Sequence, residues 1–239
     1  MPETHTQQTF VICSARSWNR ELPQRLAQRT GHRFELIDNR EQLTAESLQE
    51  MEPEIVFFPH WSWIVPASIH ERFECVMFHM TDLPYGRGGS PLQNLIACGH
   101  QETVMTAFQC TDEMDAGPVL LKRPLGMGGS AEEILIRADA LIEEMIVQII
   151  EKRPEPVAQV GEPLAFHRRT PADGNLKELD DLQQVHDYIR MLDAEGYPSA
   201  FLDIGAFRLE FNRASLKRDA VLADVRITLR TDPKTPENQ

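Results

Sequence analysis

A histidine at the end of a predicted strand is the residue in this sequence with the clearest capacity for chemistry. His79 follows the apolar run Cys75–Phe78 and opens a loop rich in glycine and proline that ends at Pro91. Loops at the carboxyl ends of strands carry the ligands and catalytic groups of α/β proteins. Asp115, in a turn after a later predicted strand, could orient this histidine and make it more basic. The two residues together predict a histidine–aspartate site at the rim of a sheet.

Each of these residues also has a structural interpretation. A lone histidine at a strand end more often has a structural role, and an aspartate in an acidic segment is more often a turn residue. The loop after the histidine favours chemistry, because Gly86, Gly88 and Gly89 leave room for a ligand near the backbone. Arg87 adds a planar fork for a carboxylate or a phosphate.

A third loop, Phe58–Pro66, also follows a predicted strand and contains Trp61 and Trp63. The two indole rings could fill the core, or they could line a slot for a flat heterocycle. His60 and Ser62 in the same loop are weaker candidates. The sequence has neither a GxGxxG nor a GxxxxGK[ST] motif, so it gives no fingerprint for a dinucleotide or a nucleoside triphosphate.

The first part of the chain alternates strand and helix patterns. The expected strands are nearly continuous apolar runs, which is typical of parallel strands covered on both faces. Ser130 and Glu133 predict a capping box at the start of the strongest helix. The strands are expected at Thr9–Cys13, Arg33–Ile37, Glu54–Phe58, Cys75–His79, Glu102–Gln109 and Gly117–Lys122, and the helices at Trp18–Thr30, Thr44–Met51 and Ala131–Lys152. The pattern predicts an α/β fold with a mostly parallel sheet over residues 1–152.

The composition changes at Arg153-Pro154-Glu155-Pro156, which indicates a linker over residues 153–165. Residues 166–239 are expected to form a small α+β subdomain. Its pattern predicts one helix followed by three β segments, at 179–193, 199–203, 206–211 and 220–227.

Charge and composition exclude several classes of partner. The formal net charge of −13 argues against nucleic acid, whose binding free energy comes largely from lysine and arginine on phosphates. No apolar run approaches the roughly 20 residues of a membrane span. The first residues lack the features of a signal peptide, so a cytoplasmic protein without membrane contact is expected. The four cysteines form no CxxC pair, which argues against a zinc site. Cys13, Cys75 and Cys110 lie in or beside predicted strands and indicate small buried residues.

The loop from Met77 to Pro91 resembles the signature of the folate-dependent formyltransferase family, roughly N-x-H-x-S-L-L-P-x-x-R-G-x-x-P. The sequence matches it at the positions of His79, Thr81, Leu83-Pro84, Arg87-Gly88 and Pro91. Weaker similarities lie in Asp115-Ala116-Gly117 for the D-x-G element, in Trp63-Ile64-Val65-Pro66 for an I-L-P stretch, and in the second-domain segments 168–174 and 196–201.

The resemblance implies a Rossmann-like formyltransferase core with a small C-terminal subdomain, closest in character to the amino-sugar N-formyltransferases. It implies acyl transfer from 10-formyltetrahydrofolate to an amine, without a metal. By this resemblance His79 and Asp115 are catalytic, and the remaining residues of the expected site divide into two groups. The folate-binding residues are Trp63, Ile64, Val65, Leu83, Thr111 and Asp112, and the substrate-binding residues are Thr81, Pro84, Arg87 and Gly88.

One departure from the family pattern concerns Met77, which stands where the family has an asparagine that holds the formyl oxygen. Methionine cannot donate that hydrogen bond. The expected acceptor is a small-molecule amine, first of all an amino sugar linked to a nucleotide. Methionyl-tRNA as acceptor, and a folate-binding relative with weakened activity, are the alternatives. A homodimer is left open.

Overall fold

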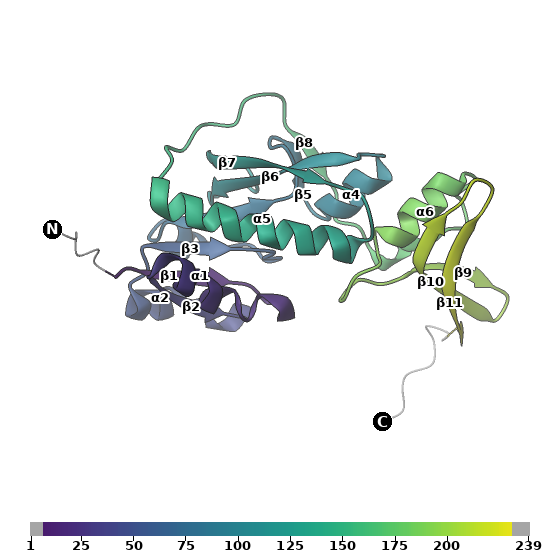
Figure 1. The fold of residues 1–239 in the computed structure, drawn as a ribbon, viewed down its shortest axis with the longest axis horizontal. Helices are drawn as coiled ribbons and strands as arrows, with labels where there is room; N and C mark the ends of the chain where they lie inside the picture. Colours follow the sequence, from purple (N-terminus) through teal and green to yellow (C-terminus); the bar gives the residue numbers. More distant parts are fainter. Residues whose placement is uncertain (1–6, 231–239) are drawn as a thin grey trace. The chain divides into compact units, whose positions relative to one another are not determined.

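The computed structural model describes residues 7–230, which fold into two compact units (Figure 1). The first unit comprises the described residues up to Pro91 together with Thr103–Leu125 and Arg137–Phe166. The second comprises Leu92–Glu102, Gly126–Ile136 and the described residues from His167 onward. None of the helices in residues 7–230 is both long and apolar enough to cross a membrane.

A six-stranded sheet in the order β2-β1-β3-β4-β6-β7 forms the centre of the first unit. The strands are β1 (Thr9–Cys13), β2 (Arg33–Ile37), β3 (Ile55–Phe58), β4 (Cys75–His79), β6 (Glu102–Gln109) and β7 (Val119–Gly126). The pairs formed by β1 to β4 are parallel, whereas β6 runs antiparallel to β4. The expected mostly parallel sheet is therefore confirmed. The last strand begins later than predicted, because Gly117 and Pro118 belong to the preceding turn.

Helices connect these strands, and their ends follow local capping rules. The helices of this region are α1 (Leu22–Thr30), α2 (Ala45–Met51), α3 (Ala67–His70), α4 (Pro91–Ala97) and α5 (Ala131–Lys152). The first helix begins at Leu22 rather than at Trp18, because Ser17–Asn19 form a separate 3₁₀ turn. The predicted bounds of α5 are confirmed, and Ser130 and Glu133 form the expected reciprocal cap.

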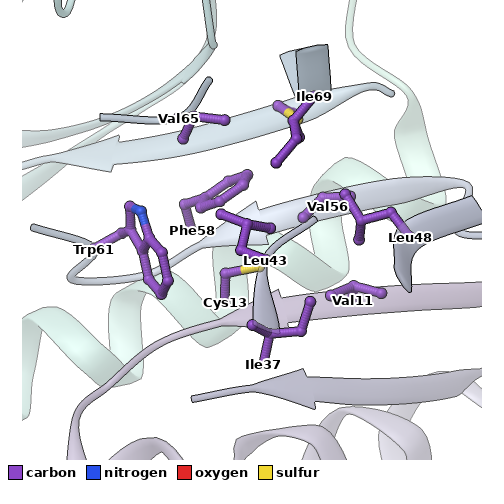
Figure 2. Packing of buried hydrophobic residues seen from close by; sticks show 11 residues of the cluster. Val11, Cys13, Ile37, Leu43, Leu48, Val56, Phe58, Trp61, Val65 and Ile69 are labelled. Atoms are coloured by element: carbon purple, nitrogen blue, oxygen red, sulfur yellow. The ribbon is translucent and has the colours of Figure 1, made fainter. Parts of the chain in front are cut away.

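Side chains from β1, β3 and β4 build one hydrophobic cluster of the first unit (Figure 2). Trp61 and Val65 belong to this cluster, so the loop after β3 contributes directly to the core. Cys13 and Cys75 are buried there, and burial raises the pKa of both thiols. Burial, with a smaller contribution from the carboxylate of Asp115, raises the pKa of Cys110 to about 11. These thiols are therefore protonated at neutral pH, which agrees with the interpretation of these cysteines as buried structural residues.

The segment after α5 returns to the sheet as part of the first unit. Its last residues form β8 (Leu164–Phe166), which pairs in parallel with β5 (Tyr85–Gly88). The sequence pattern gave neither strand, because both are short and lack the alternation of a half-buried strand. Residues 153–166 are called the strap below. The glycine-rich loop is thus held by a stretch of chain that had been expected to act as a linker.

The second unit contains a three-stranded antiparallel sheet in the order β11-β10-β9. Its main elements are α6 (Leu182–Arg190), β9 (Ala200–Ile204), β10 (Phe207–Leu216) and β11 (Val221–Leu229), preceded by a 3₁₀ turn at Pro171–Gly174. The predicted helix and three β segments are confirmed, although α6 is shorter than predicted because Asp181 caps it. Side chains of α6 pack against one face of the sheet.

Candidate active site

His79 is the last residue of β4, and its buried ring is fixed by the loop that follows it. Its Nε2 atom lies 2.8 Å from the carbonyl oxygen of Gly86. Because a carbonyl can only accept, Nε2 must carry the proton of this hydrogen bond. The other ring nitrogen, Nδ1, lies 3.8 Å from Oδ2 of Asp115. The structure therefore brings together the two residues that the sequence singled out for catalysis.

Asp115 reaches this position by a route that differs from the expected one. Since β6 is antiparallel to β4, the loop after β6 starts beside Cys75, where the N–H of Cys110 donates to the Cys75 carbonyl at 2.8 Å. The loop then turns tightly, with Asp115 in the left-handed region at φ 53°. At Gly117 even a Cβ atom would lie 1.7 Å from the carbonyl oxygen of Gln109. Only glycine allows this close turn.

The carboxylate of Asp115 is held by the glycine-rich loop. The backbone N–H of Gly88 donates to Oδ2 at 2.8 Å, which is the same oxygen that faces His79. Both side chains are largely buried. A charge-assisted hydrogen bond of this kind orients a carboxylate more strongly than a neutral one. One backbone amide thereby fixes the acid that faces the histidine.

Gln159 of the strap connects the same residues from the other side, and the sequence interpretation missed it. Its Nε2 donates to the carbonyl oxygens of Asp115 and Gly117, each at 2.8 Å. Its Oε1 accepts from Nη2 of Arg87 at 2.8 Å and from Nε at 3.2 Å. One half-buried amide thus joins both loops of the site. No local signal marks a glutamine in a polar stretch; only the pairing of β5 with β8 identifies it.

The strap also explains two of the glycines. At Gly86, with φ 72°, a Cβ atom would lie 2.7 Å from the side chains of both Phe166 and Thr81. At Gly88, with φ 102°, it would lie 2.4 Å from the backbone oxygen of Phe166. The glycines therefore give room to the returning strap, whereas the sequence interpretation had assigned that room to a ligand.

The four residues expected to bind substrate differ in their access. Thr81 and Pro84 are buried, and the carbonyl of Thr81 accepts from the hydroxyl of Thr106 at 2.7 Å. Arg87 is held by Gln159 and by an ion pair with Glu113 at 2.8 Å. The backbone N–H of Gly88 already donates a hydrogen bond to the carboxylate of Asp115. These residues shape and support the loop in the described structure.

The residues expected to bind folate lie on the three loops that follow β3, β4 and β6, and they also differ in their access. Trp63 and Ile64 are 38% and 78% exposed, whereas Val65 and Leu83 are buried and can offer a ligand only backbone groups. The hydroxyl of Thr111 donates to a carbonyl of its own turn, and Asp112 is exposed beside His70. The two tryptophans therefore differ. Trp61 fills the core, whereas Trp63 remains accessible to a ligand.

A group of buried polar atoms lies on the 3₁₀ turn Ser17–Asn19, on the loop after β3 and on α5. Within the described residues, Trp18 Nε1, Asn19 Oδ1, His60 Nε2, Trp61 Nε1 and Asp139 Oδ1 have no hydrogen-bond partner. His60 Nε2 lies 3.5 Å from Asp139 Oδ1, and the rings of Trp61 and Trp63 meet edge-on at 4.8 Å. Buried polar atoms normally find partners, and exceptions often mark sites that bind water or ligands.

Met77 lies two residues before His79 on β4, so both side chains project from the same face of the strand. It is half-buried, and its neighbours across the sheet are Phe58 and Phe108. A thioether only accepts weak hydrogen bonds, so this position supplies no donor beside His79. Within residues 7–230, no group of three or more His, Cys, Asp or Glu side chains is placed to hold a metal ion.

Two sequence models of known families match this chain. The sequence model of formyl transferases matches residues 5–133, more than half of the chain, and that of the methionyl-tRNA formyltransferase C-terminal domain matches residues 171–228. The chain belongs to the formyl transferase family. The resemblance noted in the glycine-rich loop is thereby confirmed.

Several solved structures share the fold. A methionyl-tRNA formyltransferase from Clostridium thermocellum is 44% identical and superposes with a TM-score of 0.90, over 93% of this chain and 100% of that one. HypX from Aquifex aeolicus, solved with tetrahydrofolic acid, has a TM-score of 0.72 at 18% identity, over 90% of this chain and 39% of its own. A sugar N-formyltransferase from Shewanella sp. has a TM-score of 0.64 at 14% identity, over 94% and 99%. The last two show similarity of fold alone.

Curated methionyl-tRNA formyltransferases match at lower coverage. Three of them are 25–31% identical over 109–179 residues, and the chain spans 57%, 38% and 35% of their lengths.

Proposed function

We propose that this formyltransferase moves a formyl group from 10-formyltetrahydrofolate to a primary amine. The observation that carries the proposal is the buried pair of His79 and Asp115, with Asp115 oriented by the N–H of Gly88. An amine attacking an acyl carbon must lose a proton, and a positioned histidine beside a carboxylate can take it. The free thiols of the chain suit a reducing, cytoplasmic setting.

The hydrogen bond to Gly86 determines which nitrogen of His79 acts. Nε2 keeps its proton for the Gly86 carbonyl, so the lone pair of the neutral ring is on Nδ1. When Nδ1 takes the proton of the amine, the resulting imidazolium faces Asp115 Oδ2. The carboxylate stabilises that charge, while the hydrogen bond from Nε2 to Gly86 holds the ring. The imidazolium then gives its proton to the folate nitrogen that leaves as its bond to the formyl carbon breaks.

The loop after β3 is proposed to hold the folate. The donor supplies an activated formyl group, and its flat pterin requires apolar surface with a few polar groups. Trp63 and Ile64 offer exposed apolar surface, and the unpartnered N–H of Trp61 lies beneath Trp63. The complex of HypX with tetrahydrofolic acid supports this cosubstrate for the fold.

We propose a small amine as the acceptor, with an amino sugar on a nucleotide as the first choice. The net charge of −13 disfavours tRNA, and a sugar N-formyltransferase covers 94% of the chain at similar length. Methionyl-tRNA is the second candidate. It is favoured by the 44% identity to the Clostridium thermocellum enzyme and by the matching C-terminal domain.

The test is formyl transfer from 10-formyltetrahydrofolate to a panel of nucleotide-linked amino sugars and to methionyl-tRNA. Mass spectrometry detects the gain of one CO on the acceptor. His79→Ala is the catalytic variant, and His100→Ala is its matched control outside the site. Transfer to tRNA alone, with binding that weakens steeply as salt increases, would overturn the choice of acceptor. Folate binding without transfer to any amine would indicate the weakened relative that Met77 suggests.

A further inference from the structure

The outer strand of the C-terminal sheet combines a free edge with an apolar surface. Among the described strands β11 has only β10 beside it, so one side of its backbone has no strand partner. Five large apolar side chains towards its C-terminal end are exposed: Ile204 57%, Phe207 49%, Val225 46%, Ile227 62% and Leu229 71%. Two others, Leu216 at 37% and Leu222 at 57%, lie towards its other end. Natural sheets usually protect such an edge, because it can pair with another chain.

All five residues lie on one face of the sheet. The register pairs Phe207 with Leu229 and with Ile204, and it places Ile227 and Val225 two and four residues before Leu229. The same face contains Val221 and Ala223, which pack against the cluster under α6. The helix therefore covers one half of this face and leaves the other half exposed. We call the exposed half the apolar patch.

The sequence that follows β11 is polar. Thr231–Gln239 contains only Thr, Asp, Pro, Lys, Glu, Asn and Gln, so it supplies no large apolar side chain. The opposite face of the sheet carries the exposed Leu222 and the charged pairs Asp203–Arg208, Glu210–Arg226 and Arg213–Asp224. A partner for this strand must therefore match apolar residues on one face and alternating charges on the other.

We propose that β11 pairs in antiparallel fashion with β11 of a second copy, about a two-fold axis at Val225. In this register the apolar face matches itself, because Val221 lies opposite Leu229, Ala223 opposite Ile227, and Val225 opposite its own copy. On the charged face Asp224 lies opposite Arg226 of the second copy. Opposite charges and apolar pairs directly across a ladder are the favourable cross-strand arrangements.

The neighbouring two-fold registers are unfavourable. An axis perpendicular to the sheet keeps each face on its own side and passes through one residue of the strand, so the nearest alternatives to Val225 are its two neighbours. An axis at Asp224 places two aspartates directly opposite each other, and an axis at Arg226 does the same for two arginines. Like charges in this position are destabilising. The order of charges along β11 therefore favours Val225 over both of its neighbours as the centre.

The pairing also gives the apolar patch a neighbour. In each copy α6 covers the end of β11 that contains Val221 and Ala223. The antiparallel arrangement places Ile227 and Leu229 of the second copy beside that covered end, and the reverse holds by symmetry. The exposed half of one sheet thus lies next to the helix-covered half of the other. This surface fits a second copy of the chain.

A single cysteine at the axis tests the register. In a Cys98→Ser background, which removes the exposed native thiol, Val225→Cys is expected to form a covalent dimer on mild oxidation. Leu222→Cys is the matched control. It lies opposite Thr228 of the second copy, so its two thiols would be about 20 Å apart, far beyond the reach of a disulfide. The unmodified protein should sediment at twice the chain mass of 27.3 kDa.

Val225→Lys provides the second measurement, because it places two ammonium groups at the axis. The variant is expected to sediment as a monomer while its circular dichroism and thermal unfolding remain close to those of the parent. A monomeric parent protein in the micromolar range would overturn the proposal. A dimer that forms its disulfide through Phe207→Cys instead of Val225→Cys would also overturn it, because the faces would then pack against each other without strand pairing.

Discussion

Replacing Gln159 by leucine should lower both the stability of the protein and its rate of formyl transfer. The side-chain amide of Gln159 donates to Asp115 and Gly117 and accepts from Arg87. Leucine has a similar size but can make none of these bonds. The two backbone carbonyls would then depend on water, and Arg87 would keep its ion pair with Glu113 but lose its amide partner. Asp115 would lose a contact that fixes its turn.

The magnitude follows from the number and kind of these bonds. Two neutral hydrogen bonds contribute about 1 kcal/mol each, and a bond from a charged group contributes about 1.5–3 kcal/mol. Gln159 is half-buried, so water recovers part of this sum. We expect a loss of about 2–3 kcal/mol in the free energy of unfolding. Because displacement of a catalytic group by about 1 Å can lower a rate 100-fold, kcat should fall by about 10- to 100-fold.

Two companion variants separate the contributions of Gln159. Gln159→Glu keeps acceptor oxygens for Arg87 but cannot donate to the carbonyl of Asp115, so its kcat should fall as in the leucine variant while more stability is retained. Val160→Ala alters the adjacent side chain, which is 87% exposed, and should change neither quantity. Urea unfolding and steady-state formyl transfer measure both. A leucine variant that loses stability yet keeps the parental kcat would refute a role for Gln159 in positioning Asp115.

His79→Ala should remove most turnover while the unfolding midpoint stays within a few degrees, and normal turnover would exclude His79 from the reaction. Met77→Asn should raise kcat, on the order of 100-fold if no other donor serves the formyl oxygen; an unchanged kcat would show that one does. Gly88→Ala should destabilise by about 2–4 kcal/mol in urea unfolding, because its Cβ would meet a strap carbonyl, whereas Gly99→Ala, also at positive φ but in open space, should cost less. Burial alone would raise the pKa of Glu143, but hydrogen bonds from two arginines of α1 lower it. Its contribution to stability is therefore present above the ordinary pKa of a glutamate and is lost as pH falls through the lowered value, so Glu143→Gln should flatten the acid side of a stability profile.

The central sheet could be predicted from the sequence because its strands are apolar and uninterrupted. The runs at Thr9–Cys13 and Cys75–His79 leave little alternative to buried strands, and α5 shows both its apolar stripe and its cap. The direction of β6 could not be predicted in this way. Strand patterns determine which faces are buried, but they do not determine whether neighbouring strands are parallel.

The candidate site was predictable only in part, because some of its contacts join distant parts of the chain. His79 and Asp115 stand out by residue type and by position in loops, and the structure places them 3.8 Å apart. Gln159 has no such signal, because its role arises from the pairing of β5 with β8. The sequence marks Gly86 and Gly88 as positions that need room near the backbone. It does not show that Phe166, about 80 residues along the chain, takes up that room. Local patterns cannot reveal contacts of this kind.

The strap gives the site its own unfolding behaviour. It contacts the glycine-rich loop through the three-residue strand β8 and through Gln159, which lies 72 residues beyond Arg87. Contacts between distant parts of a chain form late in folding, and short exposed strands open more readily than a buried sheet. The amides of β5 should therefore exchange with deuterium faster than those of β4. Opening of this small pair would release Asp115 from Gln159 while the central sheet remains folded, so activity should disappear on warming before the protein unfolds.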